Sequence, residues 1–260
     1  DLPPIEDGAP DAPRLFVAAA GMSPGWRRAS LLMSTDGGAR WEPIGGTAAP
    51  ATMGTALSVL GEAAPELFDL GGAVEIMLLN AAMTIGDADD PALLGGANLA
   101  LLGDELIQFG QAEPLGGARW RLSRLLRGRR ATESAIATHR AGERFVLIEP
   151  STLARLSPPL AAMGGAVRLM ASGVGDLATP AEDAIPAMAG GLRPLAPVRL
   201  RATPMADGGF MIGWTRRSRA GWTWSDGGDA PIGEAREAYR LTLQGAGGGG
   251  RSVETGPPPR

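Results

Sequence analysis

The sequence predicts an all-β protein made of antiparallel hairpins and small sandwich- or barrel-like domains. Apolar and polar residues alternate over 101–110 and again over 119–130, and a short segment containing Pro and Gly separates the two runs. This arrangement is typical of an antiparallel hairpin with one buried face and one solvated face. A third apolar run, 144–148, predicts a third strand. We expect the chain to be organised around this central hairpin region, 98–149.

The composition excludes several classes of function. The 260 residues contain no Cys and one His, which removes disulfides, thiolate metal sites and cysteine nucleophiles. The net charge is −4 and every basic residue is Arg, a usage that we attribute to a GC-rich genome rather than to nucleic-acid binding. We therefore expect no nucleic-acid partner, no metal and no cofactor.

Length and hydropathy indicate a folded protein. The chain is long enough for one large β unit or for two or three small domains. Its hydrophobic content of 44% and charged content of 20% are typical of a soluble fold. The longest apolar stretches fall far short of the ~20 residues that span a bilayer, so no stable membrane span is expected. No signal peptide is visible, and a first residue other than Met suggests a piece of a longer polypeptide.

The first 191 residues are expected to form a linker, 1–13, and one or more β-rich domains, 14–191. The linker is rich in Pro and acidic residues. The run 14–20 predicts a strand, and the Pro-Gly pair after it predicts a turn. The run 29–34 is expected to be the antiparallel partner of that strand.

Residues 34–41, Ser-Thr-Asp-Gly-Gly-Ala-Arg-Trp, resemble the Asp box, a hairpin motif of sialidase-like propellers and other proteins. In this motif the carboxylate of Asp36 accepts backbone hydrogen bonds, Gly supplies the turn dihedrals, and Trp41 packs under the hairpin. A sialidase would need several such boxes around an Arg-rich centre, and the sequence contains one. We therefore expect a structural turn here rather than a glycosidase.

Further elements flank the central region. The run 73–79 alternates and predicts a strand, and 87–91 predicts a turn or loop. After the central region, 151–156 predicts a short helical turn capped by its Ser. The run 166–172 predicts another strand, whereas 178–191 is rich in Ala, Gly and Pro and is expected to run over the surface.

The segment 192–244 is similar to the first half of a fibronectin type III domain. It begins with a Pro-rich junction, and strands are expected at 198–202, 209–214 and 239–243. A complete domain of this type needs seven strands, so the segment is expected to be partial. The Gly- and Pro-rich residues 245–260 predict a flexible tail.

Three runs in the central region resemble the C-terminal part of the large tail-tip, or host-specificity, proteins of long-tailed phages and gene transfer agents. The runs are 102–109, 121–133 and 139–145, and the second ends in the motif Arg-Gly-Arg-Arg-Ala-Thr-Glu at 127–133. In that family the fifth residue of the motif is usually Gly, whereas here it is Ala131. A tight turn with positive φ is therefore not expected at this position.

This resemblance implies a non-enzymatic virion component, a structural part of a phage-like tail tip or baseplate. It implies location in the virion tail after assembly in the bacterial cytoplasm, contacts with other tail and baseplate proteins, a homotrimer, and attachment to a host-cell glycan or receptor. Full-length relatives carry a TIM-barrel-like, glycosidase-type domain further upstream, which nothing here matches. The alternative is a carbohydrate-binding module, or part of a glycoside hydrolase acting on cell-envelope glycans, with Trp41, Trp120, Trp222 or Trp224 as stacking platforms.

His139 is the one imidazole available for acid–base catalysis, and Asp104, Glu105 and Glu133 are carboxylates of the same region. No nucleophile or metal motif accompanies this His, so a hydrogen-bonded structural histidine is the favoured interpretation. Asp104 and Glu105 point to opposite faces of a strand and cannot form a glycosidase pair together. We expect one of them to pair with an Arg of the facing strand, and we predict no catalytic residue.

Arg127, Arg129 and Arg130 could together cradle a phosphate or a lipid head group, because guanidinium groups bind such anions in a bidentate manner. The alternative, which we favour, is a solvated strand end neutralised by Glu133 and Glu143.

A second group, near the C-terminal end, combines aromatic and charged residues. Trp222 and Trp224 could stack on sugars, although covering a domain edge is the favoured interpretation. The charged residues that flank them are Arg216, Arg217, Arg219 and Asp226.

Overall fold

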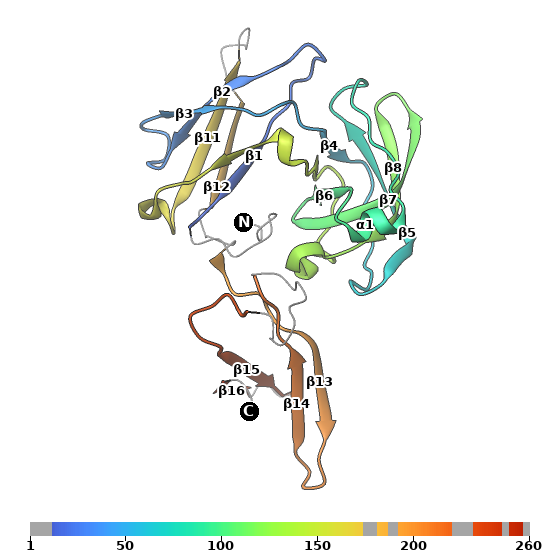
Figure 1. Ribbon diagram of the computed structural model, residues 1–260, viewed down its shortest axis with the longest axis vertical. Helices are drawn as coiled ribbons and strands as arrows, with labels where there is room; N and C mark the ends of the chain where they lie inside the picture. Colours follow the sequence, from blue (N-terminus) through green and yellow to red (C-terminus); the bar gives the residue numbers. More distant parts are fainter. Residues whose placement is uncertain (1–11, 174–180, 187–191, 220–230, 246–249, 257–260) are drawn as a thin grey trace. The chain divides into compact units, whose positions relative to one another are not determined.

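The computed structural model describes residues 12–173, 181–186, 192–219, 231–245 and 250–256, and it confirms the all-β class (Figure 1). The strand pairs are antiparallel, and α1 (Asp90–Leu94) is the one α-helix of the described ranges. A helix able to cross a membrane is absent from these ranges. The chain divides into two compact units between Arg193 and Pro194, inside the Pro-rich stretch expected to be a junction.

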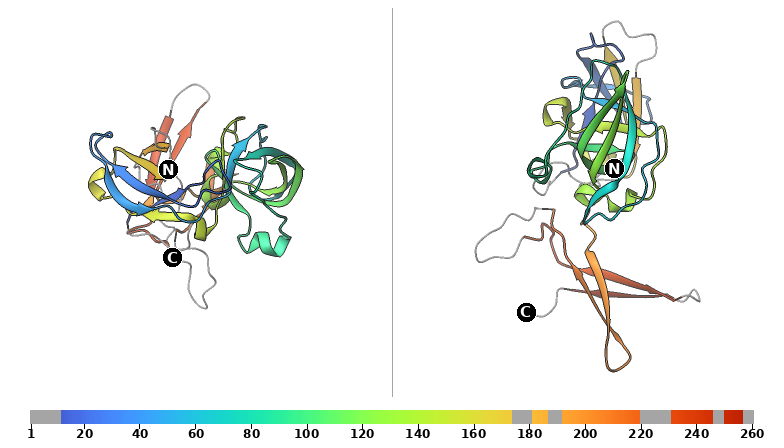
Figure 2. Two further views of the ribbon diagram at one scale, coloured as in Figure 1. Left: turned by 90° about the horizontal axis from the view of Figure 1, so that it is seen from above. Right: turned by 90° about the vertical axis from the view of Figure 1, so that its right-hand side faces the viewer.

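Six strands of the first unit close into a barrel in the order β4-β5-β8-β7-β6-β9. Their bounds are β4 (Met53–Ala56), β5 (Phe68–Leu78), β6 (Leu99–Leu102), β7 (Glu105–Gly116), β8 (Arg119–Leu126) and β9 (Arg144–Leu147). β4 pairs with β9 and so joins the first strand of the barrel to the last. Closure removes the unpaired edges that an open sheet would carry. Figure 2 shows the curved ribbons of these strands from two further sides.

The barrel encloses an apolar core. Alternate residues of β5, Val74, Ile76 and Leu78, are almost fully buried, and Phe109 of β7 and Phe145 of β9 belong to the same cluster. Because successive strand residues face opposite sides, the alternation that predicts the strand at 73–79 also selects the residues of the core.

The central region forms the predicted hairpin, with one change. β7 pairs with β8 as expected, for example Ala112 with Leu122. The strand expected at 101–110 is instead two strands, β6 and β7, which pair with each other around Gly103 and Asp104. The φ of Gly103 is 58°, a conformation that glycine adopts without strain and that reverses the chain. The third strand, β9, is confirmed and pairs with β6 and β4.

The first unit also contains a four-stranded sheet, in the order β12-β11-β2-β3, and a ribbon of β1 and β10. The bounds are β1 (Leu15–Ala18), β2 (Ala29–Ser34), β3 (Glu42–Gly46), β10 (Leu153–Leu156), β11 (Ala166–Gly173) and β12 (Ala181–Pro186). The strands expected at 14–20, 29–34 and 166–172 are therefore confirmed. The Asp box forms the turn between β2 and β3.

The expected pairing of β1 with β2 is wrong. β1 pairs with β10, and β2 lies between β3 and β11, so both edges of β2 are occupied. The prediction assumed that strands adjacent in sequence pair with each other. Residues 19–28 do contain a turn, where the Trp26 N–H donates to the Ser23 carbonyl, but the chain then leads away from β1 instead of returning along it.

Two predictions of local structure between strands are also corrected. The loop expected at 87–91 contains the start of α1, because the Asp89 carboxylate caps the helix by accepting the Ala92 N–H at 2.9 Å. The helical turn expected at 151–156 is a single 3₁₀ turn, Pro150–Thr152, followed at once by β10.

One strand lies in a segment expected to be irregular. β12 falls within 178–191 and pairs with β11 from Ala171 opposite Ala181 to Ala166 opposite Pro186. The sequence of β12, Ala-Glu-Asp-Ala-Ile-Pro, has no apolar alternation, so its strand conformation comes from this pairing rather than from its own pattern. The remaining residues of 178–191 lie outside the described ranges.

The described residues of the second unit form two hairpins rather than a seven-stranded sandwich. β13 (Val198–Pro204) and β14 (Phe210–Thr215) pair on either side of the predicted turn, and β15 (Tyr239–Gln244) pairs with β16 (Gly250–Thr255). The three strands expected in this part are confirmed. The tail expected at 245–260 is corrected, because it contains β16.

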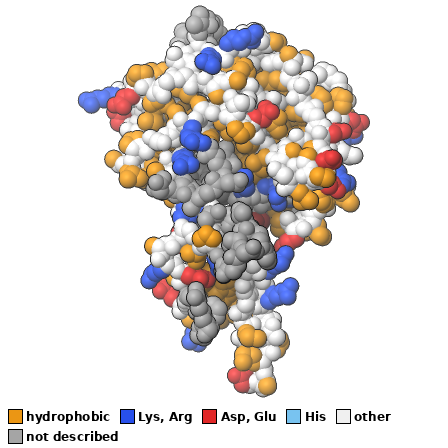
Figure 3. All heavy atoms as spheres, viewed as in Figure 1, with side chains coloured by type: hydrophobic (Ala, Val, Ile, Leu, Met, Phe, Trp, Pro, Cys, Tyr) orange, Lys and Arg blue, Asp and Glu red, His pale blue; other side chains and the backbone are white. Residues whose placement is uncertain are grey.

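The second unit has an aromatic contact between its two hairpins and exposed apolar side chains near the turn of the first hairpin. Trp214 at the end of β14 meets Tyr239 at the start of β15 edge to face, with the ring centres 5.0 Å apart. At the far end of the β13-β14 hairpin, Met205 and Phe210 are exposed, and Figure 3 shows hydrophobic atoms there.

Gly54 tests how tightly the barrel closes. A Cβ atom on Gly54 would lie 2.1 Å from the Met77 carbonyl oxygen, so Gly54→Ala must push β4 away from β5. We expect this substitution to lower the free energy of unfolding by about 3 kcal/mol or more, measured by urea denaturation. Gly61→Ala is the control, because its Cβ would meet nothing within 4 Å, and its effect should stay below about 0.5 kcal/mol. Equal midpoints for the two variants would contradict this account of closure.

Candidate functional site

Five ionisable side chains form a cluster at one place in the barrel, which we call the ionic cluster: Asp69, Glu105, Arg127, His139 and Glu143. The side chains of Glu105 and Arg127 are 0% exposed, and that of His139 is 1% exposed. Burying charged groups is costly unless each is paired and hydrogen-bonded, so the contacts of every member decide what the cluster can do.

Arg127 and Glu105 form the centre of the cluster. The Arg127 Nε and Nη2 atoms donate to the two Glu105 carboxylate oxygens at 3.0 and 2.8 Å, a bidentate geometry. The Gly128 N–H donates to Glu105 Oε1 at 2.5 Å. The remaining terminal nitrogen of Arg127 donates to the Gly61 carbonyl at 2.8 Å and to Asp69 at 3.3 Å. The predicted pairing of Glu105 with an Arg is thus confirmed, with the Arg placed directly after β8.

His139 bridges two carboxylates. Its Nε2 lies 2.6 Å from Glu105 Oε2, and its Nδ1 lies 2.6 Å from Glu143 Oε1. An ionised carboxylate can only accept, so both ring nitrogens must donate, and the ring is an imidazolium. Burial by itself would lower the pKa of His139, but the hydrogen bonds to Glu105 and Glu143 outweigh it and raise this pKa above its usual value.

The same contacts act in the opposite direction on Glu105. Burial by itself would raise the pKa of Glu105, but the hydrogen bonds from His139, Arg127 and the Gly128 N–H outweigh it and lower this pKa. In both groups the contacts favour the charged form. The hydrogen bonds predicted for His139 are confirmed, and its structural role stays a prediction.

Two glycines make room for the cluster. Gly128 has a φ of 57°, and a Cβ on it would lie 3.0 Å from the Glu133 Cα. A Cβ on Gly103 would lie 2.4 Å from the Glu143 carboxylate. Both residues combine a left-handed backbone with close neighbours, so a side chain at either position would displace part of the cluster.

The three arginines of the 127–133 motif do not form a phosphate cradle. Arg127 is fully enclosed and paired with Glu105 and Asp69, so the favoured interpretation of a solvated end neutralised by Glu133 and Glu143 is wrong for this residue. Arg129 is half-buried, and its Nε donates to the Gln108 side-chain oxygen at 2.7 Å. Burial and the neighbouring Arg130 together lower the pKa of Arg129.

The expectation that the backbone has no positive φ at Ala131 is wrong. Its φ is 70° and that of the preceding Arg130 is 52°, so the chain makes a left-handed turn here with two residues that are not glycine. Such conformations place Cβ close to a backbone oxygen and cost roughly 1–2 kcal/mol each. The turn is held from both sides: the Gly128 N–H donates to Glu105, and Thr132 Oγ1 accepts the Leu106 N–H.

The other carboxylates considered for catalysis lie outside the ionic cluster. Asp104 is exposed in the turn between β6 and β7. Glu133 begins a 3₁₀ turn, Glu133–Ala135, and packs beside Gly128. Two members of the cluster, Asp69 and Glu143, were not foreseen as partners of His139 or Glu105. The contact between His139 and Glu143 could have been predicted from their spacing, because they lie four residues apart across a turn that contains Gly142. We find no such sequence signal for Asp69.

Two of the four tryptophans considered as sugar platforms lie in the described residues, and both contact other side chains of the protein. The Arg168 guanidinium lies over the Trp41 ring at 5.9 Å. Trp120 is partly buried against the barrel core. Trp222, Trp224 and Asp226 lie outside the described residues.

The Asp box has the expected geometry. Asp36 Oδ1 accepts the Arg40 N–H at 3.0 Å and the Ser34 hydroxyl at 2.8 Å, and these bonds lower the pKa of Asp36. Gly37 and Gly38 have φ values of 77° and 97°, so the turn uses glycine where a side chain would be strained.

Two of the arginines that precede Trp222 and Trp224 in the sequence, Arg217 and Arg219, contact residues more than ten positions away. Arg219 pairs with Glu234, with Nε and Oε1 at 2.7 Å. The Arg217 Nε donates to the Ala196 carbonyl at 2.8 Å. These contacts tie together segments of the second unit that are far apart in sequence.

The arrangement of the ionic cluster favours a structural role. Both ring nitrogens of His139 are occupied by carboxylates, so neither is free to take a proton from a substrate. Glu105 starts β7, Arg127 follows β8, and His139 lies in the loop before β9, so the contacts fasten three parts of the barrel to one another.

Ala131→Gly tests the strain in the motif turn. We expect the substitution to raise the free energy of unfolding by about 0.5–1 kcal/mol, because glycine relieves the left-handed strain while losing more chain entropy on folding. Ala137→Gly is the matched control, since Ala137 is exposed and has no positive φ, and it should destabilise by a similar amount. Both values come from urea denaturation. Destabilisation by both variants would contradict strain at Ala131.

The raised pKa of His139 predicts a loss of stability at alkaline pH. The folded pKa lies above the unfolded value of 6.5, so the stabilisation is complete below pH 6.5 and is lost as the pH rises through the folded pKa. The single His and the absence of Cys mean that no other side chain ordinarily titrates between pH 6 and 9. We expect the free energy of unfolding to fall across this window.

His139→Gln provides the control for this pH dependence. Gln cannot carry the charge, so the variant should be about 3 kcal/mol less stable at pH 6 and should lose the alkaline slope. A flat wild-type profile, or ¹⁵N shifts of a neutral imidazole at pH 7, would sink the imidazolium assignment. Glu105, whose folded pKa lies below 4.5, stabilises above pH 4.5 and adds an opposite loss as the pH falls through its folded pKa.

Comparison with known protein families finds a likeness that falls on the barrel. Residues 51–146 match the protein family described as Rcc01698-like, C-terminal. The match begins just before β4, ends inside β9 and includes all five residues of the ionic cluster. No curated protein matches the chain. The barrel of this chain, rather than its four-stranded sheet or its second unit, is thus the part that is similar to that family.

Proposed function

We propose that this chain is a structural component of a phage-like tail tip or baseplate, which contributes to tail assembly and to attachment to the host cell. In this proposal it has no catalytic activity of its own. It acts in the virion tail, together with other tail and baseplate proteins, as a homotrimer.

One observation carries the proposal. The residues that carry the resemblance to tail-tip proteins include the centre of the ionic cluster: Glu105 in the first run, Arg127 and Gly128 in the second, and His139 and Glu143 in the third. The resemblance therefore lies in residues that build and fasten the barrel, as expected for a shared scaffold rather than a shared reaction.

The chemistry of the cluster supports a role without catalysis. A catalytic His needs one nitrogen free to exchange a proton with substrate, and a glycosidase needs two carboxylates facing an open cleft. Here His139 and Glu105 are enclosed and saturated with hydrogen bonds. The described residues also contain no group of His, Asp and Glu that could hold a metal ion.

Complementation of a particle-producing strain tests the proposal. In the strain that encodes this chain, deleting its coding segment should give tails that lack part of the tip and that fail to attach to cells. Negative-stain electron microscopy and mass spectrometry of purified tails measure this. The wild-type segment should restore both properties, with the chain detected in the particles.

Two variants test whether incorporation into tails depends on an intact barrel. Arg127→Ala leaves buried carboxylates unpaired, which costs about 3–5 kcal/mol, so its incorporation into tails should fall severalfold. Arg240→Ala removes an exposed arginine paired with Glu254 and should be incorporated like the wild type. Normal, infective tails from the deletion strain, or purified tails without the chain, would overturn the proposal.

A further inference from the structure

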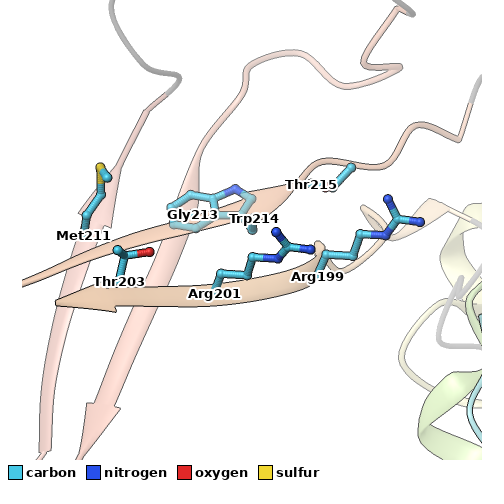
Figure 4. Close-up of a pocket in the computed structure, with 7 residues that line it drawn as sticks. All are labelled: Arg199, Arg201, Thr203, Met211, Gly213, Trp214 and Thr215. Carbon is cyan, nitrogen blue, oxygen red and sulfur yellow. The ribbon is translucent and has the colours of Figure 1, made fainter.

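The β13-β14 hairpin has a hollow on one face, and two arginines line it beside a glycine. Its lining consists of Arg199, Arg201, Thr203, Met211, Gly213, Trp214 and Thr215 (Figure 4). Figure 4 shows the side chains of Arg199 and Arg201 extending side by side from β13. Among the described residues, the lining contains two arginines, two threonine hydroxyls and apolar surface, and it contains no carboxylate.

Gly213 leaves a gap in this face of the hairpin. It pairs with Arg201 across the hairpin, and Met211 and Thr215 lie two residues away along the same face of β14. A Cβ on Gly213 would meet nothing within 4 Å, so the space above it is open. Trp214, the next residue, contributes to the lining beside this gap.

The two arginines lack the carboxylate partners that other arginines of this unit have. Arg219 pairs with Glu234 and Arg240 pairs with Glu254, whereas neither Arg199 nor Arg201 forms an ion pair with a described residue. Two guanidinium groups that line one hollow and have no carboxylate partner among the described residues can attract an anion. Each can bind a carboxylate through two parallel hydrogen bonds.

The backbone of β13 is strained at this place. The register shifts between Val198 and Arg201, which marks a bulge, and Arg199 inside it has a φ of 54°. Bulges re-aim side chains, and left-handed residues other than glycine are found preferentially at binding sites. The bulge therefore supplies a local reason why Arg199 lies beside Arg201 at the hollow.

We propose that this hollow binds the carboxylate of an acidic sugar in a cell-surface polysaccharide. Arg199 and Arg201 would hold the carboxylate, Thr203 would hydrogen-bond a sugar hydroxyl, and Met211 would contact the apolar face of the ring. The inference rests on the proposed function, because it names the class of ligand for host-cell attachment.

Titration of the whole 260-residue chain with tetragalacturonate, followed by calorimetry, tests the inference. We expect saturable binding that weakens with added salt and no binding of the neutral sugar maltotetraose. Arg199→Ala combined with Arg201→Ala should lower the affinity about tenfold or more, because charge-assisted hydrogen bonds are lost. The matched control removes two exposed arginines outside the lining, Arg236 and Arg251, by substitution to Ala and should change the affinity less than about twofold.

Gly213→Val gives an independent variant that keeps both arginines. Val suits a strand and would fill the open space above the sheet without a clash, so the fold should be unchanged while binding is abolished. Unchanged affinity in this variant or in the double Arg variant would overturn the site.

Inorganic phosphate is the competing probe. If phosphate binds as tightly as tetragalacturonate, the hollow is a general anion site and the sugar assignment is wrong. If tails contain the chain but tetragalacturonate does not bind, this inference fails while the proposed function stands. If tetragalacturonate binds but tails lack the chain, the proposed function fails.

Discussion

The buried pair of Glu105 and Arg127 is the interaction on which the barrel depends. A paired buried charge adds little net stability over an apolar pair, but an unpaired one costs several kcal/mol. The pair therefore acts mainly by penalising wrong arrangements. A slip of β7 by one residue would carry Glu105 to the opposite face and leave Arg127, which is 0% exposed, without its partner. The strand register and the ionic cluster thus require each other.

His139 extends this constraint to the strand that closes the barrel. A carboxylate such as Glu105 offers more acceptor sites than one guanidinium fills, and the rigid imidazolium ring places a second donor between it and Glu143. Because Glu143 directly precedes β9, the bridge fixes where that strand begins. Gly103 and Gly128 keep the space around the carboxylates free, so two residues without side chains are as necessary to the cluster as its charges.

Sequence patterns located most strands because burial on one face produces alternation, as in β5 and β8, and because burial on both faces produces a continuous apolar run, as in β9. They could not identify partners: β1 pairs with β10, more than a hundred residues later, and that pairing depends on the closed fold. β12 and β16 were missed because neither alternates and each becomes a strand by pairing with a stronger neighbour. The pairing of Glu105 with an Arg followed from strand geometry, whereas the roles of Asp69 and Glu143 required the fold. Ala131 misled because the surrounding contacts, rather than its own preference, set its φ.

Arg127 of the barrel differs in burial from Arg199 and Arg201 of the β13-β14 hairpin, and the partners of these arginines differ with it. In the barrel, Arg127 is enclosed, and a charge without water must have protein partners, so its donors are directed inward to Glu105, Asp69 and a carbonyl. On the β13-β14 hairpin, Arg199 and Arg201 are exposed to water and form no ion pair with a described residue, which costs little and keeps their donors available. A barrel whose buried charges are paired can hold its shape, while an exposed hairpin presents arginines that no described carboxylate pairs with. Attachment through the second unit would require both features, a barrel of fixed shape and exposed arginines available to a ligand.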